Sequence, residues 1–277
     1  NEKAIWASEE EKNSTVAEAR FFRGFAYRNL ANIFGGVPIV AEPVTEAKDD
    51  FVRNTREECW KFAKEDLEFA RTYLPITTNS PGRVVRAAAD HFLAEVNISL
   101  KDFDGAIAAA TRVIDQTDGS YSLVKQRFGK RAAETNKDYY WDLFVMGNQN
   151  RQAGNEEGIW VAQFEIGDNG AAVIGGIPNF NRPLIERMMW CSFWASAKLG
   201  YNSVAHDTTG RGSAFVRPTN YTNYTIWENA GNDIRNNEIN IKRNYYFGAD
   251  VPGYSKGELI PRSFLTTNDD TMRFVFP

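Results

Sequence analysis

Aromatic side chains are frequent in the second half of the chain, among asparagines and an arginine. An aromatic ring can stack on the apolar face of a pyranose, while amides, carboxylates and guanidinium groups bond its hydroxyls. Because large rings are usually well buried, any one of them is more often part of a core than of a binding surface. The residues that could bind a sugar in this way are Tyr139, Tyr140, Trp141, Trp190, Trp194, Tyr201 and Trp227, with Arg211 close in sequence.

No pattern of residues in the sequence indicates a catalytic site. Glycoside hydrolysis needs two carboxylates on either side of the bond. The acidic pairs at 49–50, 156–157 and 269–270 are only adjacent in sequence, and most such charges are solvated surface. His91 and His206 are the two histidines, and no metalloprotease motif, phosphate loop or nucleophile elbow is present. We therefore expect no enzyme and no cofactor.

The net charge, the two cysteines and the hydropathy argue against nucleic-acid-binding, metal-binding and membrane-spanning proteins. The net charge is −4 and no run of Lys and Arg supplies a basic patch, so we expect no nucleic-acid partner. Metal binding would need clustered ligands, so we expect no metal. Cys59 and Cys191 are expected to be small buried side chains. The sequence does not decide whether they form a disulfide. No stretch approaches the ~18 apolar residues of a membrane span.

The elements that must position these residues begin with helices. Apolar residues at three-and-four spacing predict helices over 15–34, 55–74, 85–100 and from about 104. Thr15 with Glu18, and Thr55 with Glu58, each fit a capping box at a helix start. A glycine pair at 35–36 is expected to end the first helix. The expected inward residues are Val16, Ala19, Phe22, Ala26, Leu30 and Ile33; Trp60, Ala63, Leu67, Ala70 and Leu74; Ala88, Phe92, Leu93, Val96 and Leu100; and Ala106, Ile107, Ala110, Val113 and Ile114.

The third and fourth helices are joined by a short turn and carry small alanines that would let them approach closely. Such a pair resembles a tetratricopeptide repeat, which buries its apolar faces by stacking on neighbours. Helical periodicity fades from about residue 125, where residues 158–166 read as a strand and 184–199 as a helix. We predict a mostly α fold with irregular loops and short strands. Residues 1–130 form the helical part and 131–277 the irregular part, packed as one unit with the first.

An ordered series of motifs resembles the SusD/RagB family. Residues 18–27 and the following 34–40 are similar to the family's first helix and its exit. The segments 53–58, 82–83, 87–88, 93–94 and 121–123 follow in the family's order. Glu157 to Trp160 resembles a family strand, and Arg217-Pro218-Thr219 with Asp233 and Arg235 resembles its "PT … D-x-R" segment. Together these matches span roughly residues 15–240, and their order is stronger evidence for the resemblance than any single motif.

The resemblance implies a SusD-like fold built on tetratricopeptide-like helix pairs. It implies a lipid-anchored protein on the outer face of an outer membrane, which captures an oligosaccharide or polysaccharide for a SusC-like TonB-dependent transporter, without catalysis. Segment 180–212 departs most from the family pattern, so we expect residues of this segment to set the ligand preference. The predicted ligand-binding residues are Trp190, Trp194, Tyr201, His206, Asp207, Arg211, Tyr139, Trp141 and Trp227.

Other readings remain open. The lipid-bearing cysteine and the C-terminal helical region of the family have no counterpart here, and we expect a fragment lacking both ends. Helices of this kind commonly present a peptide-binding surface, so a protein- or peptide-binding scaffold is the first alternative. A SusD-like binder of peptide or glycoprotein cargo is the second. An exposed aromatic arc on the irregular part would favour sugar, and a polar groove along the helices would favour peptide.

Overall fold

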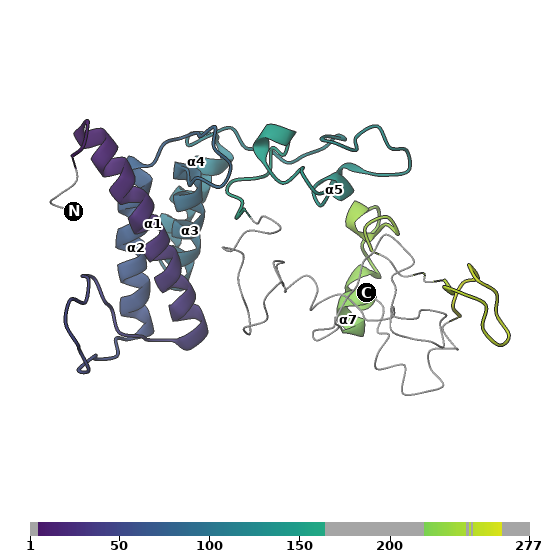
Figure 1. The fold of residues 1–277 in the computed structure, drawn as a ribbon, viewed down its shortest axis with the longest axis horizontal. Helices are drawn as coiled ribbons and strands as arrows, with labels where there is room; N and C mark the ends of the chain where they lie inside the picture. The colour runs from purple at the N-terminus through teal and green to yellow at the C-terminus, as the bar shows by residue number, and fades with distance from the viewer. Residues whose placement is uncertain (1–4, 164–218, 242–243, 245, 262–277) are drawn as a thin grey trace. The chain divides into compact units, whose positions relative to one another are not determined.

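The computed structural model describes residues 5–163, 219–241, 244 and 246–261 (Figure 1). The chain divides into two compact units. Unit 1 comprises residues 1–130 and 146–162, and unit 2 comprises residues 131–145 and 163–277. Each unit is described by itself.

Unit 1 opens with the long helix α1 (Glu9–Phe34), of 26 residues. Ser8 caps it by accepting the Glu11 N–H at 3.1 Å, and Glu9 to Glu11 complement the positive end of the helix dipole. The predicted start at Thr15 is therefore wrong. Its hydroxyl instead donates to the Glu11 carbonyl at 2.9 Å, one turn back within the helix. Gly35 ends the helix as expected, at φ 76°.

The predicted inner face of α1 is also wrong by about one residue. Its buried residues are Ala17, Phe21, Gly24, Tyr27 and Ala31, whereas Phe22 and Ile33 are 48% and 72% exposed. The physical reason is close packing against α2 (Arg56–Tyr73). A Cβ at Gly24 would lie 3.0 Å from the Ala63 carbonyl oxygen, so the absence of a side chain at Gly24 lets α2 approach this face of α1.

Helix α2 agrees with its sequence pattern. Thr55 and Glu58 form the predicted capping box, with the Thr55 N–H donating to Glu58 at 2.7 Å. Ala63, Leu67, Ala70 and Leu74 are buried, and Trp60 packs partly buried against the core. The predicted stripe of this helix is thus confirmed.

Helices α3 (Arg86–Ser99) and α4 (Phe103–Ile114) form the expected antiparallel pair around a short turn (Figure 1). Asp102 caps α4 by accepting the Gly105 N–H at 3.0 Å. Ala88, Leu93, Val96 and Ala106 are buried as predicted. Ile107 and Ile114 were expected inside, but they are 64% and 74% exposed, because α4 packs on α3 through Ala106 and Ala109.

Three arginines and two aspartates inside unit 1 form an ion network that the apolar pattern does not reveal. Asp90, on α3, accepts from Arg112 and from Arg71 Nε at 3.0 Å. Asp118 pairs with Arg71 at 3.2 Å and Arg86 at 3.4 Å. Both carboxylates are almost fully buried, so they are tolerable only because several guanidinium groups surround them. The network ties α2, α3 and α4 to the segment after α4.

Among the described residues, the regular structure outside α1 to α4 consists of short pieces. They are α5 (Tyr139–Asp142), η1 (Arg151–Ala153), α7 (Asn220–Asn223), η4 (Thr225–Trp227) and η5 (Ile234–Asn236). The predicted strand at 158–166 is not formed over its described residues 158–163. Trp160 explains why. Its indole N–H donates to the Gly82 carbonyl at 2.9 Å and its ring packs against Phe21, so this segment docks on helices rather than on another strand.

Strand pairing among the described residues is limited to isolated bridges, Tyr246 with Leu259 and Val251 with Tyr254. The mostly α fold class with paired helices is therefore confirmed for the described part. The helix predicted at 184–199 lies outside it. In that part, no helix is both long and apolar enough to cross a membrane.

Candidate functional site

Tyr139 and Trp141 stand on α5, a single helical turn of unit 2. The turn forms because Asp138 caps it, accepting the Trp141 N–H at 2.8 Å. Both rings are half-buried. The cap thus fixes the backbone of two of the predicted sugar-binding residues.

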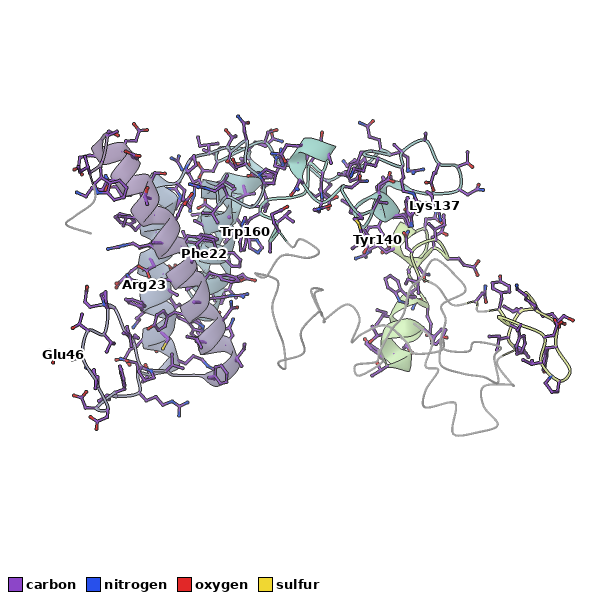
Figure 2. All side chains as sticks on the ribbon, in the orientation of Figure 1. Phe22, Arg23, Glu46, Lys137, Tyr140 and Trp160 are labelled. Carbon is purple, nitrogen blue, oxygen red and sulfur yellow. The ribbon has the colours of Figure 1, made fainter. Side chains whose placement is uncertain are left out.

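Two cations lie over the Trp141 ring. Arg131 Cζ is 4.7 Å and Lys137 Nζ 4.8 Å from the ring centroid, a distance at which cation–π attraction acts. Figure 2 labels Lys137 and, beside it, Tyr140 of the same turn. Both cations therefore lie close to the ring that the sequence predicts to bind a sugar.

Trp227 ends η4, in the described segment 219–241 of unit 2. Its indole N–H donates to the Thr222 carbonyl at 2.9 Å, and Arg235 Cζ lies 5.9 Å from its ring centroid. Arg235 also forms a two-point ion pair with Asp233, with Nε to Oδ1 at 2.9 Å. These hydrogen bonds lower the pKa of Asp233 to about 2, so the carboxylate is charged at any ordinary pH. Asp233 and Arg235 are the residues of the "D-x-R" motif, and their pairing gives that motif a structural role.

Asn240 joins the two segments. Its amide donates to Asp138 Oδ2 at 2.9 Å and to the Ile234 carbonyl at 2.8 Å. The turn that carries Trp141 is therefore bonded to the segment that follows Trp227, although they are far apart in sequence. The Asn240 side-chain amide joins these segments by its hydrogen bonds. Different cations lie over the Trp141 and Trp227 rings.

The other predicted residues are Trp190, Trp194, Tyr201, His206, Asp207 and Arg211. All six lie outside the described residues, as do Cys191, Arg217 and Pro218. The proposed ligand-preference segment 180–212 thus stays a prediction of the sequence.

The acidic pair at 156–157 has a structural role. Glu156 accepts from the Ser122 hydroxyl at 2.6 Å, and Glu157 accepts the Val124 N–H at 2.9 Å. Both carboxylates therefore fasten the segment after α4 to the segment after η1. His91 is exposed on α3 and packs edge-on to Phe92. Within the described residues, no group of three His, Cys, Asp or Glu side chains could hold a metal ion. Cys59 is buried, as expected, and is a free cysteine.

Sequence reasoning missed a cleft of about 320 Å³ in unit 1. It is formed by the loop between α2 and α3, the segment after α4, and residues 150–161. Its aromatic lining residues are Tyr121 and Trp160. The sequence contained a sign of it, since two family-like motifs, 82–83 and 121–123, contribute to its walls.

The chain is similar to known proteins over its helical part. A family model described as SusD-like, "starch-binding associating with outer membrane", matches residues 4–98, which cover α1, α2 and nearly all of α3. SusD-like protein P2 of Formosa agariphila is 33% identical over 109 residues, which are 39% of this chain and 22% of that protein. SusD-like protein P38 of the same organism is 24% identical over 177 residues, covering 60% of this chain and 33% of that protein.

A solved structure of a SusD-like protein from Bacteroides fragilis is 25% identical, with a TM-score of 0.48, over 58% of this chain and 29% of that chain. The chain therefore spans at most about a third of the length of these relatives.

Proposed function

Because the chain is a SusD/RagB-like family member, we propose that it binds an oligosaccharide at the bacterial cell surface and hands it to a SusC-like TonB-dependent transporter. The match of residues 4–98 to a family described as starch-binding carries this proposal. The helices supply the scaffold, and the aromatic and polar side chains of unit 2 supply the chemistry that a sugar needs.

The described residues of unit 2 support the binding step. Trp141 and Trp227 each carry a ring with a guanidinium group over it, at 4.7 and 5.9 Å. Asp138, Asp233 and Asn240 place acceptors and donors on the same two bonded segments. Rings with such groups nearby can hold a pyranose by stacking and by hydrogen bonds to its hydroxyls. Trp190, Trp194 and Tyr201 would extend this surface.

The proposal includes no catalysis. Glu156 and Glu157 are bonded within the fold, and Asp233 is held by Arg235. Arg235 also lowers the pKa of Asp233 to about 2, whereas the general acid of a glycosidase requires a raised pKa. The proposed attachment to the outer membrane is through a lipid anchor on the full-length protein, in keeping with the family's description.

An affinity-gel screen tests the binding step. The chain is run through gels containing starch, β-glucans or uronate polymers, and retardation in at least one gel is expected. Trp194→Ala and Trp141→Ala should reduce it. Tyr73→Ala is the matched control, because Tyr73 is an exposed aromatic residue on α2 in unit 1.

The outcomes separate the readings. If both tryptophan variants are retarded as much as the unaltered chain, the chain binds sugar, but at a site that does not depend on Trp141 or Trp194. No retardation by a folded chain would contradict the proposal. Release of smaller sugars from any of the polymers would overturn the absence of catalysis.

A protein- or peptide-binding scaffold is the second candidate, and one observation favours it. The outer surfaces of α3 and α4 expose large apolar side chains, each more than half accessible, at Ile98, Phe103, Ile107 and Ile114. A folded chain that binds peptides or glycoproteins, and no glycan, would favour this candidate or the related SusD-like binder of such cargo.

A further inference from the structure

The cleft of unit 1 is built on rigid walls. Trp160 is held by its N–H bond to the Gly82 carbonyl at 2.9 Å, and its ring packs edge-on against Phe21, Phe25 and Phe92, with centroids 5.5 to 6.5 Å apart. Figure 2 shows Trp160 beside Phe22, whose ring centroid is 6.1 Å away. One wall is thus fixed to α1 and α3 before any ligand enters, which reduces the entropy that binding must overcome.

Another part of the lining is organised by Arg151. Its guanidinium group lies 4.6 Å from the Tyr121 ring centroid. It donates to the Glu156 carbonyl at 3.0 Å and to the carbonyl of Ser120. A guanidinium group has more N–H donors than these bonds use. Arg151 has no carboxylate partner among the described residues, so its positive charge is not neutralised by an ion pair.

Apart from Arg83, the remaining lining groups are apolar or uncharged. Ile76, Pro81 and Ile159 are apolar, and Thr77, Thr78 and Ser80 bring hydroxyls. The second charged residue of the lining is Arg83, which pairs with Glu18 at 2.6 Å. Burial raises the pKa of Tyr121, so its hydroxyl stays neutral and can donate. Within the described part of the chain, the lining contains cations and no acid.

This combination selects a ligand class. A bare inorganic anion would leave the aromatic and apolar walls unused, whereas a neutral sugar would leave the charge of Arg151 unanswered. A ring with several hydroxyls and one anionic substituent would use all of them. The volume is at the small end of ligand pockets, which start at about 300 Å³, so one such ring fits inside.

We propose that this cleft binds a single acidic sugar residue, a hexuronate or a sulfated hexose, with its anionic group on Arg151 and its ring between Trp160 and Tyr121. The proposal rests on the proposed function, since it names the class of sugar, but it assigns that sugar to unit 1 rather than to the aromatic residues of unit 2. The cleft then selects glycan chains that carry a negative charge over neutral ones.

The test follows the indole N–H resonance of Trp160 by NMR in the full chain, with trigalacturonate, maltotriose and sodium sulfate as probes. Trp160→Phe assigns the resonance. We expect trigalacturonate to shift it, with an affinity at least about tenfold above that of maltotriose, because a charge-assisted hydrogen bond contributes about 1.5–3 kcal/mol and 1.4 kcal/mol is tenfold.

Arg151→Gln should weaken trigalacturonate binding by about tenfold or more. Arg53→Gln is the matched control, because Arg53 also donates to backbone carbonyls, those of Gly36 and Phe34 at 2.7 and 3.0 Å, and lies outside the cleft. It should leave the affinity unchanged. If Arg151→Gln fails to fold, Arg83→Gln replaces it and should weaken binding in the same direction, by a smaller factor.

Three results would overturn the inference. They are no shift of Trp160 with trigalacturonate, equal affinity for maltotriose, and a shift that sulfate alone reproduces. The affinity-gel screen is independent of this resonance. Retardation in a glycan gel without a Trp160 response would refute the acidic-sugar cleft and leave the proposed function standing.

Discussion

Single residues in this chain act through close approach and through paired charge. Gly24 shows the first. A Cβ added there would meet the Ala63 carbonyl oxygen at 3.0 Å and Leu67 Cγ at 3.1 Å. Arg235 shows the second, since its two-point bond to Asp233 also places a cation over Trp227. Neither role can be read from hydropathy alone.

Gly24→Ala should lower the free energy of unfolding, although alanine favours helices by about 1 kcal/mol over glycine. The expected net loss is about 1–3 kcal/mol, because the added methyl meets backbone rather than a flexible side-chain end. Urea denaturation measures it. Ala26→Leu is the control, since Ala26 is exposed on the same helix and should tolerate the larger side chain. Equal stability of Gly24→Ala and the unaltered chain would contradict the packing described.

Arg235→Gln should return the pKa of Asp233 from about 2 toward its ordinary value of 3.8. In the unaltered chain, the lowered pKa means that Asp233 contributes stability above pH 4, and that this contribution disappears as the pH falls toward 2. A carbon-detected NMR titration of the Asp233 carboxyl measures the change. A midpoint that stays near 2 in the variant would show that another group holds this carboxylate.

At the scale of elements, the helices are held together by small residues and by buried charge as much as by large apolar side chains. Asp90 and Asp118 lie close together among Arg71, Arg86 and Arg112. Burial raises the pKa of Asp90 to about 6, helped by a hydrogen bond with Asp118 and opposed by Arg112 and Arg71. Because the two carboxyls share this hydrogen bond, the pKa of Asp118 is lowered as that of Asp90 rises.

The sign of the pH effect follows from these directions. The folded chain holds the Asp90 proton more tightly than the unfolded chain, so this group stabilises most below about pH 4 and loses its contribution as the pH rises through 6. Asp118→Asn removes the neighbouring carboxylate and should lower the Asp90 midpoint, which carboxyl NMR can follow. His91→Gln is the control, because His91 is the adjacent exposed residue of α3. An Asp90 midpoint that Asp118→Asn leaves unchanged would disprove the coupling.

At the scale of the whole molecule, unit 1 leaves one apolar surface uncovered among the described residues. Ile107 and Ile114 on α4 are exposed, as is Ile98 on α3. Repeats of this type bury such faces against a neighbouring unit, which explains why the sequence pattern predicted Ile107 and Ile114 to lie inside. Exposed apolar side chains of this kind are expected to bind an apolar dye.

The chain should therefore enhance the fluorescence of an apolar dye such as ANS while folded. A double variant, Ile107→Ser with Ile114→Ser, should reduce the signal without a large change in stability, since both side chains are already more than half exposed. Leu67→Ser, at a buried position, should instead unfold unit 1. No dye signal from the unaltered folded chain would show that this surface is covered.

The sequence by itself determined the four long helices apart from the start of α1, the Thr55 capping box, the pairing of α3 with α4 and the resemblance to SusD-like proteins. These depend on local spacing and on residue order, which a linear chain displays directly. The boundary expected near residue 130 and the six aromatic and polar residues between 190 and 211 stay predictions.

Only the tertiary structure decided which of two apolar faces of α1 is buried, because that depends on how closely α2 can approach Gly24. It also decided that the segment around Trp160 docks on helices instead of forming a strand, since its anchor, Gly82, is distant in sequence. The ion network of Asp90 and Asp118 and the cleft at Arg151 arise in the same way. Each joins side chains from several elements, and the distances between those elements are set by packing rather than by sequence spacing.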